Sequence, residues 1–126
     1  VVEGKLPKIK DTLRFYLQED KTHRVYVSNK GLSSVTEYEV LDTNSTQSLI
    51  KVRIKTGRKN QIRASLAYIG NPIVGDKKYE AKINSLSRLG LHANRLVIKH
   101  PITNKEMEFS CDAPTQFYLG FEKYKK

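Results

Sequence analysis

Six basic residues lie between positions 51 and 63, and no acidic residue lies among them. They are Lys51, Arg53, Lys55, Arg58, Lys59 and Arg63. The last three fall where a strand-like pattern gives way to a helix-like one. The dipole of a helix disfavours cations at its start, by a few tenths of a kcal/mol up to about 1 kcal/mol, whereas anions bind there readily. The arrangement indicates an anion at this point, either a nucleic-acid phosphate or a buried carboxylate from elsewhere in the fold. A solvated basic turn is the alternative.

Alternating apolar residues before this point predict strands. The inward-facing sets are Val25 and Val27; Thr36, Tyr38 and Val40; and Ile50, Val52 and Ile54. The last two segments are expected to form an antiparallel pair. Its outer face would carry acids on one strand and bases on the next, which allows cross-strand pairing.

After Gly57 the apolar residues recur at the spacing expected of a helix. Ile62, Leu66 and Ile69 fall on one face, and Gly70 is a natural helix end. Thr56 or Asn60 is the candidate cap at the start.

The C-terminal third predicts a second antiparallel pair, followed by a short helix over residues 115–126. In the pair, Leu96 and Ile98 are expected to face Met107 and Phe109. Strands on both sides of a central helix predict an α+β fold, with a mixed, mainly antiparallel sheet and flanking helices.

The composition favours a polyanionic partner. The 126 residues contain 23 Lys and Arg against 13 Asp and Glu, for a net charge of +10. No apolar run approaches the roughly 20 residues of a membrane-spanning helix, so a membrane is not an expected partner.

The cysteine and histidine content argues against a metal site. The single cysteine, Cys111, excludes an internal disulfide, fits a cytoplasmic location and is expected to be a small buried residue. His23, His92 and His100 lie far apart and have no metal-ligand spacing.

Five strings in order resemble the RluA-type family of RNA pseudouridine synthases. They are "TGRKNQIR", "GNPIVGDKKY", "LGLHANRL", "HPITNKEMEF" and "AP". The family versions are TGR-x-HQ-(I/L)-R, G-x-PI-x-GD-x-x-Y, LHA and HP. The opening "VVEG" and the segment "SVTEYEVL" also resemble strands of the family, so the likeness covers nearly the whole chain.

The resemblance implies the pseudouridine synthase catalytic fold and an enzyme that isomerises uridine to pseudouridine in RNA without cofactor or metal. In the family an Asp attacks the target nucleotide, and the base detaches, turns and is rejoined through carbon. A basic residue that matches Arg63 pairs with that Asp. By the same match, Arg58, Lys59, Asn60 and Gln61 lie near the RNA, and Leu91 and His92 line the pocket. Asp76, in the "GD" string, is expected to have a structural role in a turn.

Two departures from the family pattern qualify this implication. The HRLD-x-x-TSG-like string that carries the nucleophilic Asp is not found in the chain, and Asn60 stands where His is usual. Asn still donates and accepts hydrogen bonds but lacks imidazole chemistry.

Residues 1–126 are therefore expected to be the C-terminal portion of a catalytic domain, inactive alone, whose nucleophile lies on an N-terminal portion. Ribosomal RNA is favoured over transfer RNA as the substrate. The alternative is a non-catalytic RNA-binding module that keeps the basic groove.

Overall fold

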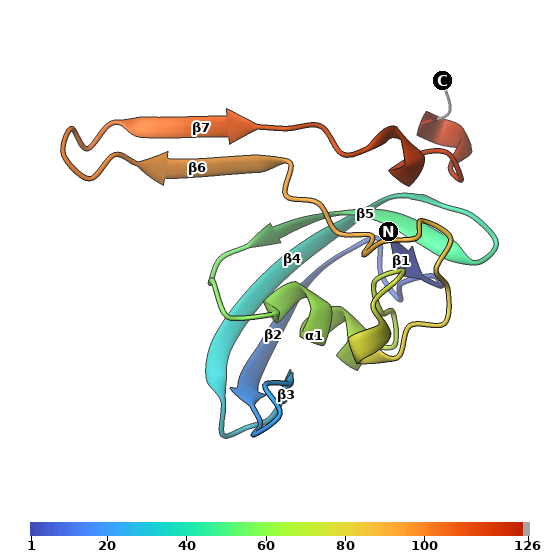
Figure 1. Ribbon diagram of the computed structural model, residues 1–126, viewed down its shortest axis with the longest axis horizontal. Helices are drawn as coiled ribbons and strands as arrows, with labels where there is room; N and C mark the ends of the chain where they lie inside the picture. Colours follow the sequence, from blue (N-terminus) through green and yellow to red (C-terminus); the bar gives the residue numbers. More distant parts are fainter. Residues whose placement is uncertain (125–126) are drawn as a thin grey trace.

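The computed structural model describes residues 1–124, which form one antiparallel sheet, one α-helix and a separate hairpin. The sheet has the order β1-β5-β4-β2-β3, and each of its pairings is antiparallel. Its strands are β1 (Val2–Glu3), β2 (Lys10–Glu19), β3 (Val25–Val27), β4 (Leu32–Thr43) and β5 (Gln47–Ile54). The helix α1 (Gln61–Tyr68) lies against one face of this sheet (Figure 1). These features confirm the predicted α+β class.

The predicted pairing of β4 with β5 is confirmed. Alternate residues of β4, including Thr36 and Tyr38, are buried because one face of the strand packs under α1. Across the outer face, Glu37 lies opposite Arg53, and Glu39 lies opposite Lys51.

Acids and bases therefore alternate on the outer face as predicted, but the ion pairs that form use other lysines. Lys55 Nζ lies 3.9 Å from Glu37, and Lys10 Nζ lies 3.8 Å from Glu39. Both pairs are exposed, so each adds little to stability.

Strand β2 was not predicted from the sequence, although it pairs with β4 on one side and with β3 on the other. Leu13 and Leu17 are buried on the face of the sheet that packs against α1. Phe15, midway between them in the strand, is partly buried against the same clusters. Charged residues at both ends of the segment obscure that alternation in the sequence.

The helix starts and ends close to the predicted positions, but its cap differs. Gly70 has a positive φ of 90°, as expected of a residue that ends a helix. Asn60 occupies the N-cap position with φ 51°, yet its side chain caps no backbone N–H group. Thr56 makes no cap either, because its hydroxyl accepts from the N–H of Val35 and donates to Gln61. The predicted side-chain cap is therefore wrong.

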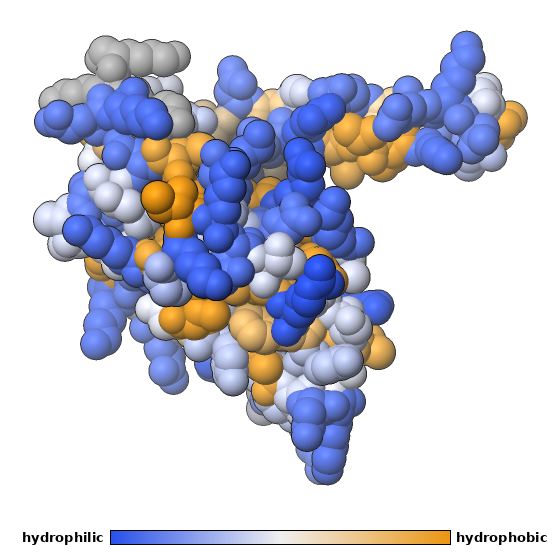
Figure 2. All heavy atoms as spheres, turned by 180° about the vertical axis from the view of Figure 1, so that it is seen from behind, coloured by the Kyte–Doolittle hydropathy of each residue, from blue (hydrophilic) through white to orange (hydrophobic). Residues whose placement is uncertain are grey.

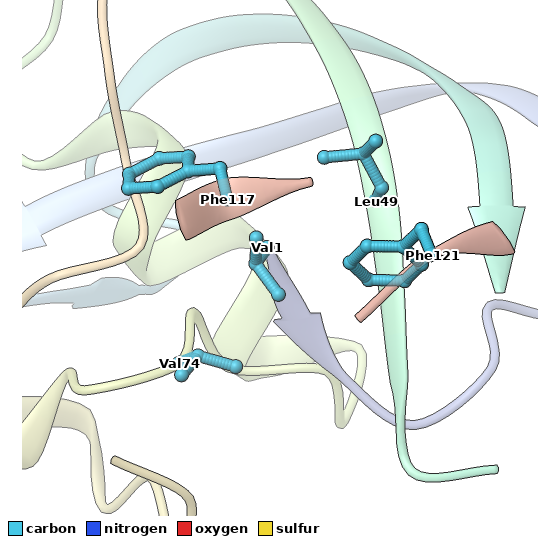
Figure 3. Packing of buried hydrophobic residues seen from close by; sticks show 5 residues of the cluster. All are labelled: Val1, Leu49, Val74, Phe117 and Phe121. Carbon is cyan, nitrogen blue, oxygen red and sulfur yellow. The ribbon is translucent and has the colours of Figure 1, made fainter. Parts of the chain in front are cut away.

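The end of the chain packs back onto β1 and β5. Phe117 and Phe121 join Val1, Leu49 and Val74 in one buried cluster (Figure 3). The expected C-terminal helix is instead two short 3-10 turns, η2 (Thr115–Phe117) and η3 (Glu122–Tyr124). Residues 125–126, which end the predicted helix, lie outside the described residues.

A two-stranded hairpin projects from this body (Figure 1). It is formed by β6 (Arg95–Lys99) and β7 (Glu106–Ser110), with Leu96 opposite Phe109 and Ile98 opposite Met107. The predicted register is confirmed. Leu96, Ile98 and Phe109 are exposed, whereas Met107 is half-buried. Figure 2 shows apolar side chains, in orange, gathered on the projecting arm.

The expected burial of Cys111 is wrong. Cys111 follows β7 directly and is exposed, as are most residues of the hairpin.

Candidate active site

The turn between β5 and α1 is organised around the buried side chain of Gln61. Its Nε2 donates to the Val35 carbonyl and to Thr36 Oγ1, both at 2.9 Å. Its Oε1 accepts from Thr56 Oγ1 at 2.7 Å and from the Arg58 N–H at 3.1 Å. These four bonds use the whole hydrogen-bonding capacity of the amide. The side chain of Gln61 therefore holds the turn to β4 and has no group free for RNA.

Arg63 projects from the first turn of α1 onto a buried carboxylate of this same chain. Its Nε donates to Asp76 Oδ2 at 2.9 Å, and its Nη2 donates to Asp76 Oδ1 at 2.7 Å. The Asp76 side chain is only 1% exposed, and the Arg63 side chain is 24% exposed. These hydrogen bonds raise the pKa of Arg63 above its ordinary value, so the guanidinium remains charged.

The carboxylate that pairs with Arg63 within this chain is Asp76, whereas the family resemblance assigned that pairing to the nucleophilic Asp of another portion of the domain. Asp76 precedes the 3-10 turn η1 (Lys77–Tyr79), as its expected role in a turn requires. Its carboxylate also binds the guanidinium of Arg63. The sequence contained the "GD" string, but no local pattern showed that its carboxylate would reach a helix 13 positions earlier.

An aromatic ring covers the guanidinium of Arg63. The Cζ atom of Arg63 lies 5.4 Å from the centre of the Tyr79 ring, and Arg24 Cζ lies 4.9 Å from the same centre. The Tyr79 hydroxyl donates to the Val25 carbonyl at 2.8 Å, which ties the ring to β3. Neither Arg24 nor Tyr79 was identified as a site residue from the sequence.

The two cations before the helix differ in how far they are neutralised. Lys59 Nζ lies 3.0 Å from Glu19 Oε1, so this charge has a partner. Hydrogen bonds from Lys59 and His23 lower the pKa of Glu19. Arg58 donates from Nε to the Ser33 carbonyl at 2.9 Å, and it makes no ion pair with a described residue.

A shallow hollow of about 230 Å³ lies beside this turn. Its lining is Ile54, Arg58, Asn60, Gln61, Ile62, Arg63 and Leu91. The hollow brings together five of the seven predicted site residues, combining two cations with apolar side chains.

Lys59 and His92, the other two predicted residues, do not line this hollow. The Nε2 of His92 lies 3.0 Å from the Cys111 carbonyl, and its ring meets Phe117 edge-on at 6.5 Å. His92 thus contacts the segments that follow β7. The residue before it, Leu91, reaches the hollow.

Within residues 1–124, no three His, Cys, Asp or Glu side chains are grouped so that they could hold a metal ion. No helix in that range is long and apolar enough to cross a membrane.

Comparison with known proteins shows which family the chain resembles. The family described as RNA pseudouridylate synthase matches residues 2–68. The uncharacterized RNA pseudouridine synthase YhcT of Bacillus subtilis (strain 168) is 38% identical over 109 residues, which are 83% of this chain and 36% of that protein. Ribosomal large subunit pseudouridine synthase D of Vibrio vulnificus (strain CMCP6) is 34% identical over 102 residues, 70% of this chain and 31% of that protein.

A solved structure has the same fold. It is titled Human RNA Pseudouridylate Synthase Domain Containing 1, with a TM-score of 0.76 at 23% identity, covering 90% of this chain and 52% of that one. The chain spans about a third of the length of the two curated relatives above. The match over more than half of its residues shows that the chain belongs to the RNA pseudouridylate synthase family, among the RluA-type members.

Proposed function

We propose that this chain is the C-terminal portion of the catalytic domain of an RNA pseudouridine synthase, which isomerises uridine to pseudouridine in structured RNA. The observation that carries the proposal is the position of Arg63. Its side chain is held by the buried carboxylate of Asp76 and lines a basic hollow, and the chain belongs to this family. Ribosomal RNA is the favoured substrate, because one of the similar proteins is named for the large ribosomal subunit. We expect the enzyme to act in the cytoplasm.

In this proposal Arg63 orients the nucleophilic Asp. Two of its five N–H groups bind Asp76, and Nη1 approaches Asn60 Oδ1 at 3.4 Å, which is a weak bond. Arg63 can therefore still donate hydrogen bonds to a second carboxylate. Such a contact would fix the carboxylate for attack on the nucleotide and favour its ionised form.

The other residues of the hollow have separate roles in the proposal. Arg58 makes no ion pair with a described residue, so it is the best placed of these cations to bind a phosphate of the RNA. Ile54, Ile62 and Leu91 offer an apolar surface against which a flipped base can pack. In this proposal the reaction uses neither a cofactor nor a metal.

We infer that the nucleophile comes from a further portion of the same catalytic domain. The similar proteins are about three times as long as the matched segments, so they contain residues enough for a second half. The hairpin gives independent support. An isolated two-stranded hairpin is marginally stable, and this one exposes Leu96, Ile98 and Phe109 by 55%, 42% and 51%. Apolar side chains exposed together mark a contact surface, which the rest of the domain would cover.

The alternative is a non-catalytic RNA-binding module, and one observation favours it. Arg63 already has a carboxylate partner, Asp76, so the cation does not by itself require a nucleophile.

The deciding experiment incubates the full product of the gene with ribosomal RNA transcripts and maps pseudouridine. A new pseudouridine at a defined position supports the enzyme. RNA binding without any product supports the module. We expect the 126-residue chain alone to bind RNA and form no product.

A further inference from the structure

The guanidinium of Arg63 is held on two sides by groups that do not line the hollow. Asp76 binds the edge formed by Nε and Nη2, and the Tyr79 ring covers the guanidinium 5.4 Å from Cζ. Neither Asp76 nor Tyr79 is part of the lining, whereas Asn60, next to Nη1, is. The free donors of Arg63 therefore face the hollow on the Asn60 side.

Asp76 can orient Arg63 because its own position is fixed. Its N–H donates to the Ile73 carbonyl, and its carbonyl accepts from the N–H groups of Tyr79 and Ala81. The preceding Gly75 has φ 81°, and a Cβ there would meet the Arg88 carbonyl oxygen at 2.2 Å. The loop thus has one tightly determined path, which brings the Asp76 carboxylate under α1.

Tyr79 is anchored in the same way. Its hydroxyl is bound to the Val25 carbonyl on β3, and Arg24 lies 4.9 Å from its ring centre. Arg24 is itself held by a 2.7 Å hydrogen bond from Nη1 to the Lys78 carbonyl. The ring is therefore a fixed support for the guanidinium.

We propose that Asp76 and Tyr79 are positioning residues of the active site, which hold Arg63 so that only its Nη1 side is presented to the carboxylate of the nucleophile. This inference rests on the proposed function. Because Asp76 balances the charge of Arg63, Arg63 acts through the direction of its hydrogen bonds. The net positive charge of the hollow comes from Arg58.

The proposal predicts a loss in kcat with little change in KM. Asp76→Asn keeps the shape of the side chain but replaces one acceptor oxygen by a donor, so the guanidinium loses its two-point orientation. Misplacement of a reacting group by about 1 Å costs on the order of 100-fold in rate. We expect kcat of the full-length enzyme to fall about 100-fold and KM for the RNA to change less than about threefold.

A double-mutant cycle separates positioning from a structural role. If Asp76 acts through Arg63, Asp76→Asn causes no further loss of kcat in an Arg63→Gln enzyme. Equal losses in both backgrounds would overturn the proposal, as would an unchanged kcat in the single variant. Asp112→Asn, at an exposed position, is the matched control. Should Asp76→Asn not fold, Tyr79→Leu is taken through the same cycle, with the same outcomes for and against.

A measurement without RNA tests positioning even if the proposed function fails. In ¹⁵N-labelled protein, hydrogen exchange at Arg63 Nε is expected to be slow and to speed up at least about tenfold in Asp76→Asn, because a buried hydrogen bond is lost. Fast exchange in the unaltered protein would overturn the positioning of Arg63. Slow exchange together with no pseudouridine formation would overturn the proposed function and leave Arg63 held by Asp76.

Discussion

Arg63 and Asp76 are joined by two parallel hydrogen bonds, Nε to Oδ2 at 2.9 Å and Nη2 to Oδ1 at 2.7 Å. Such a two-point pair fixes the plane of a guanidinium as well as its distance. It links the start of α1 to the loop before η1, and it places the remaining donors of Arg63 beside the hollow. The relationship between these two residues underlies both the expected stability and the proposed chemistry of the protein.

Arg63→Ala is expected to destabilise the protein in addition to removing the proposed catalytic contact. The substitution leaves the Asp76 carboxylate, which is 1% exposed, without its cation. Breaking a buried pair in this way costs on the order of 3 kcal/mol of unfolding free energy. Urea denaturation measures the change.

The control for this prediction is Arg95→Ala, which breaks an exposed pair with Glu108. Exposed pairs contribute at most about 1 kcal/mol. Equal effects of the two substitutions would contradict the assignment of a buried pair at Arg63.

Gln61→Ala is expected to reduce stability by about 2–3 kcal/mol, because buried partners on β4 lose their hydrogen bonds. The matched control is Gln116→Ala, at an exposed position. Thermal melts of both variants measure the difference. If Gln61→Ala melted like the control and only weakened RNA binding, Gln61 would be an RNA contact instead of a structural residue.

Arg58 and Lys59 are expected to contribute unequally to RNA binding. A cation that binds a phosphate releases counterions, so its loss reduces the slope of log K against log salt by about 0.7–0.9. We expect this reduction for Arg58→Gln and a smaller one for Lys59→Gln, because Lys59 is paired with Glu19. Filter binding at several salt concentrations gives both slopes. The reverse order would show that Lys59 leaves Glu19 to bind the RNA.

Cys111 is expected to react rapidly with a thiol reagent in the 126-residue chain, since the side chain is exposed after β7. The reaction is followed by absorbance, with and without denaturant. Reaction only after denaturation would mean that the segment after the hairpin is covered, in conflict with the structure.

The apolar patterns of the sequence predicted the elements whose alternation is clear. The register of β6 with β7 and the helix face of Ile62, Leu66 and Ile69 follow from side-chain periodicity, and the structure confirms both. Strand β2 was missed although Leu13, Phe15 and Leu17 alternate as in a strand, because charged residues at both ends of the segment obscure this short pattern. Periodicity also gave no measure of whether the hairpin would be covered, so the burial of Cys111 was predicted wrongly.

The candidate site was predictable only in part. The excess of cations indicated an anion at the start of α1, and family resemblance singled out Arg63. The identity of the anion within the chain, Asp76, depends on how the loop before η1 folds back under the helix. The contribution of Tyr79 depends on the same fold. Such contacts between distant segments have no signature in local sequence patterns.

The central claim is tested most directly by single-turnover formation of pseudouridine in the full-length enzyme, comparing Arg63→Lys with the unaltered protein. Lysine keeps the positive charge but lacks the planar guanidinium group. It therefore cannot bind Asp76 along one edge and donate hydrogen bonds to a second carboxylate from another. We predict a rate at least about 100-fold lower, consistent with the loss of one directed donor at a reacting group, and no change in an Arg95→Lys control. An unaltered rate in Arg63→Lys would contradict the assignment of Arg63 to the active site.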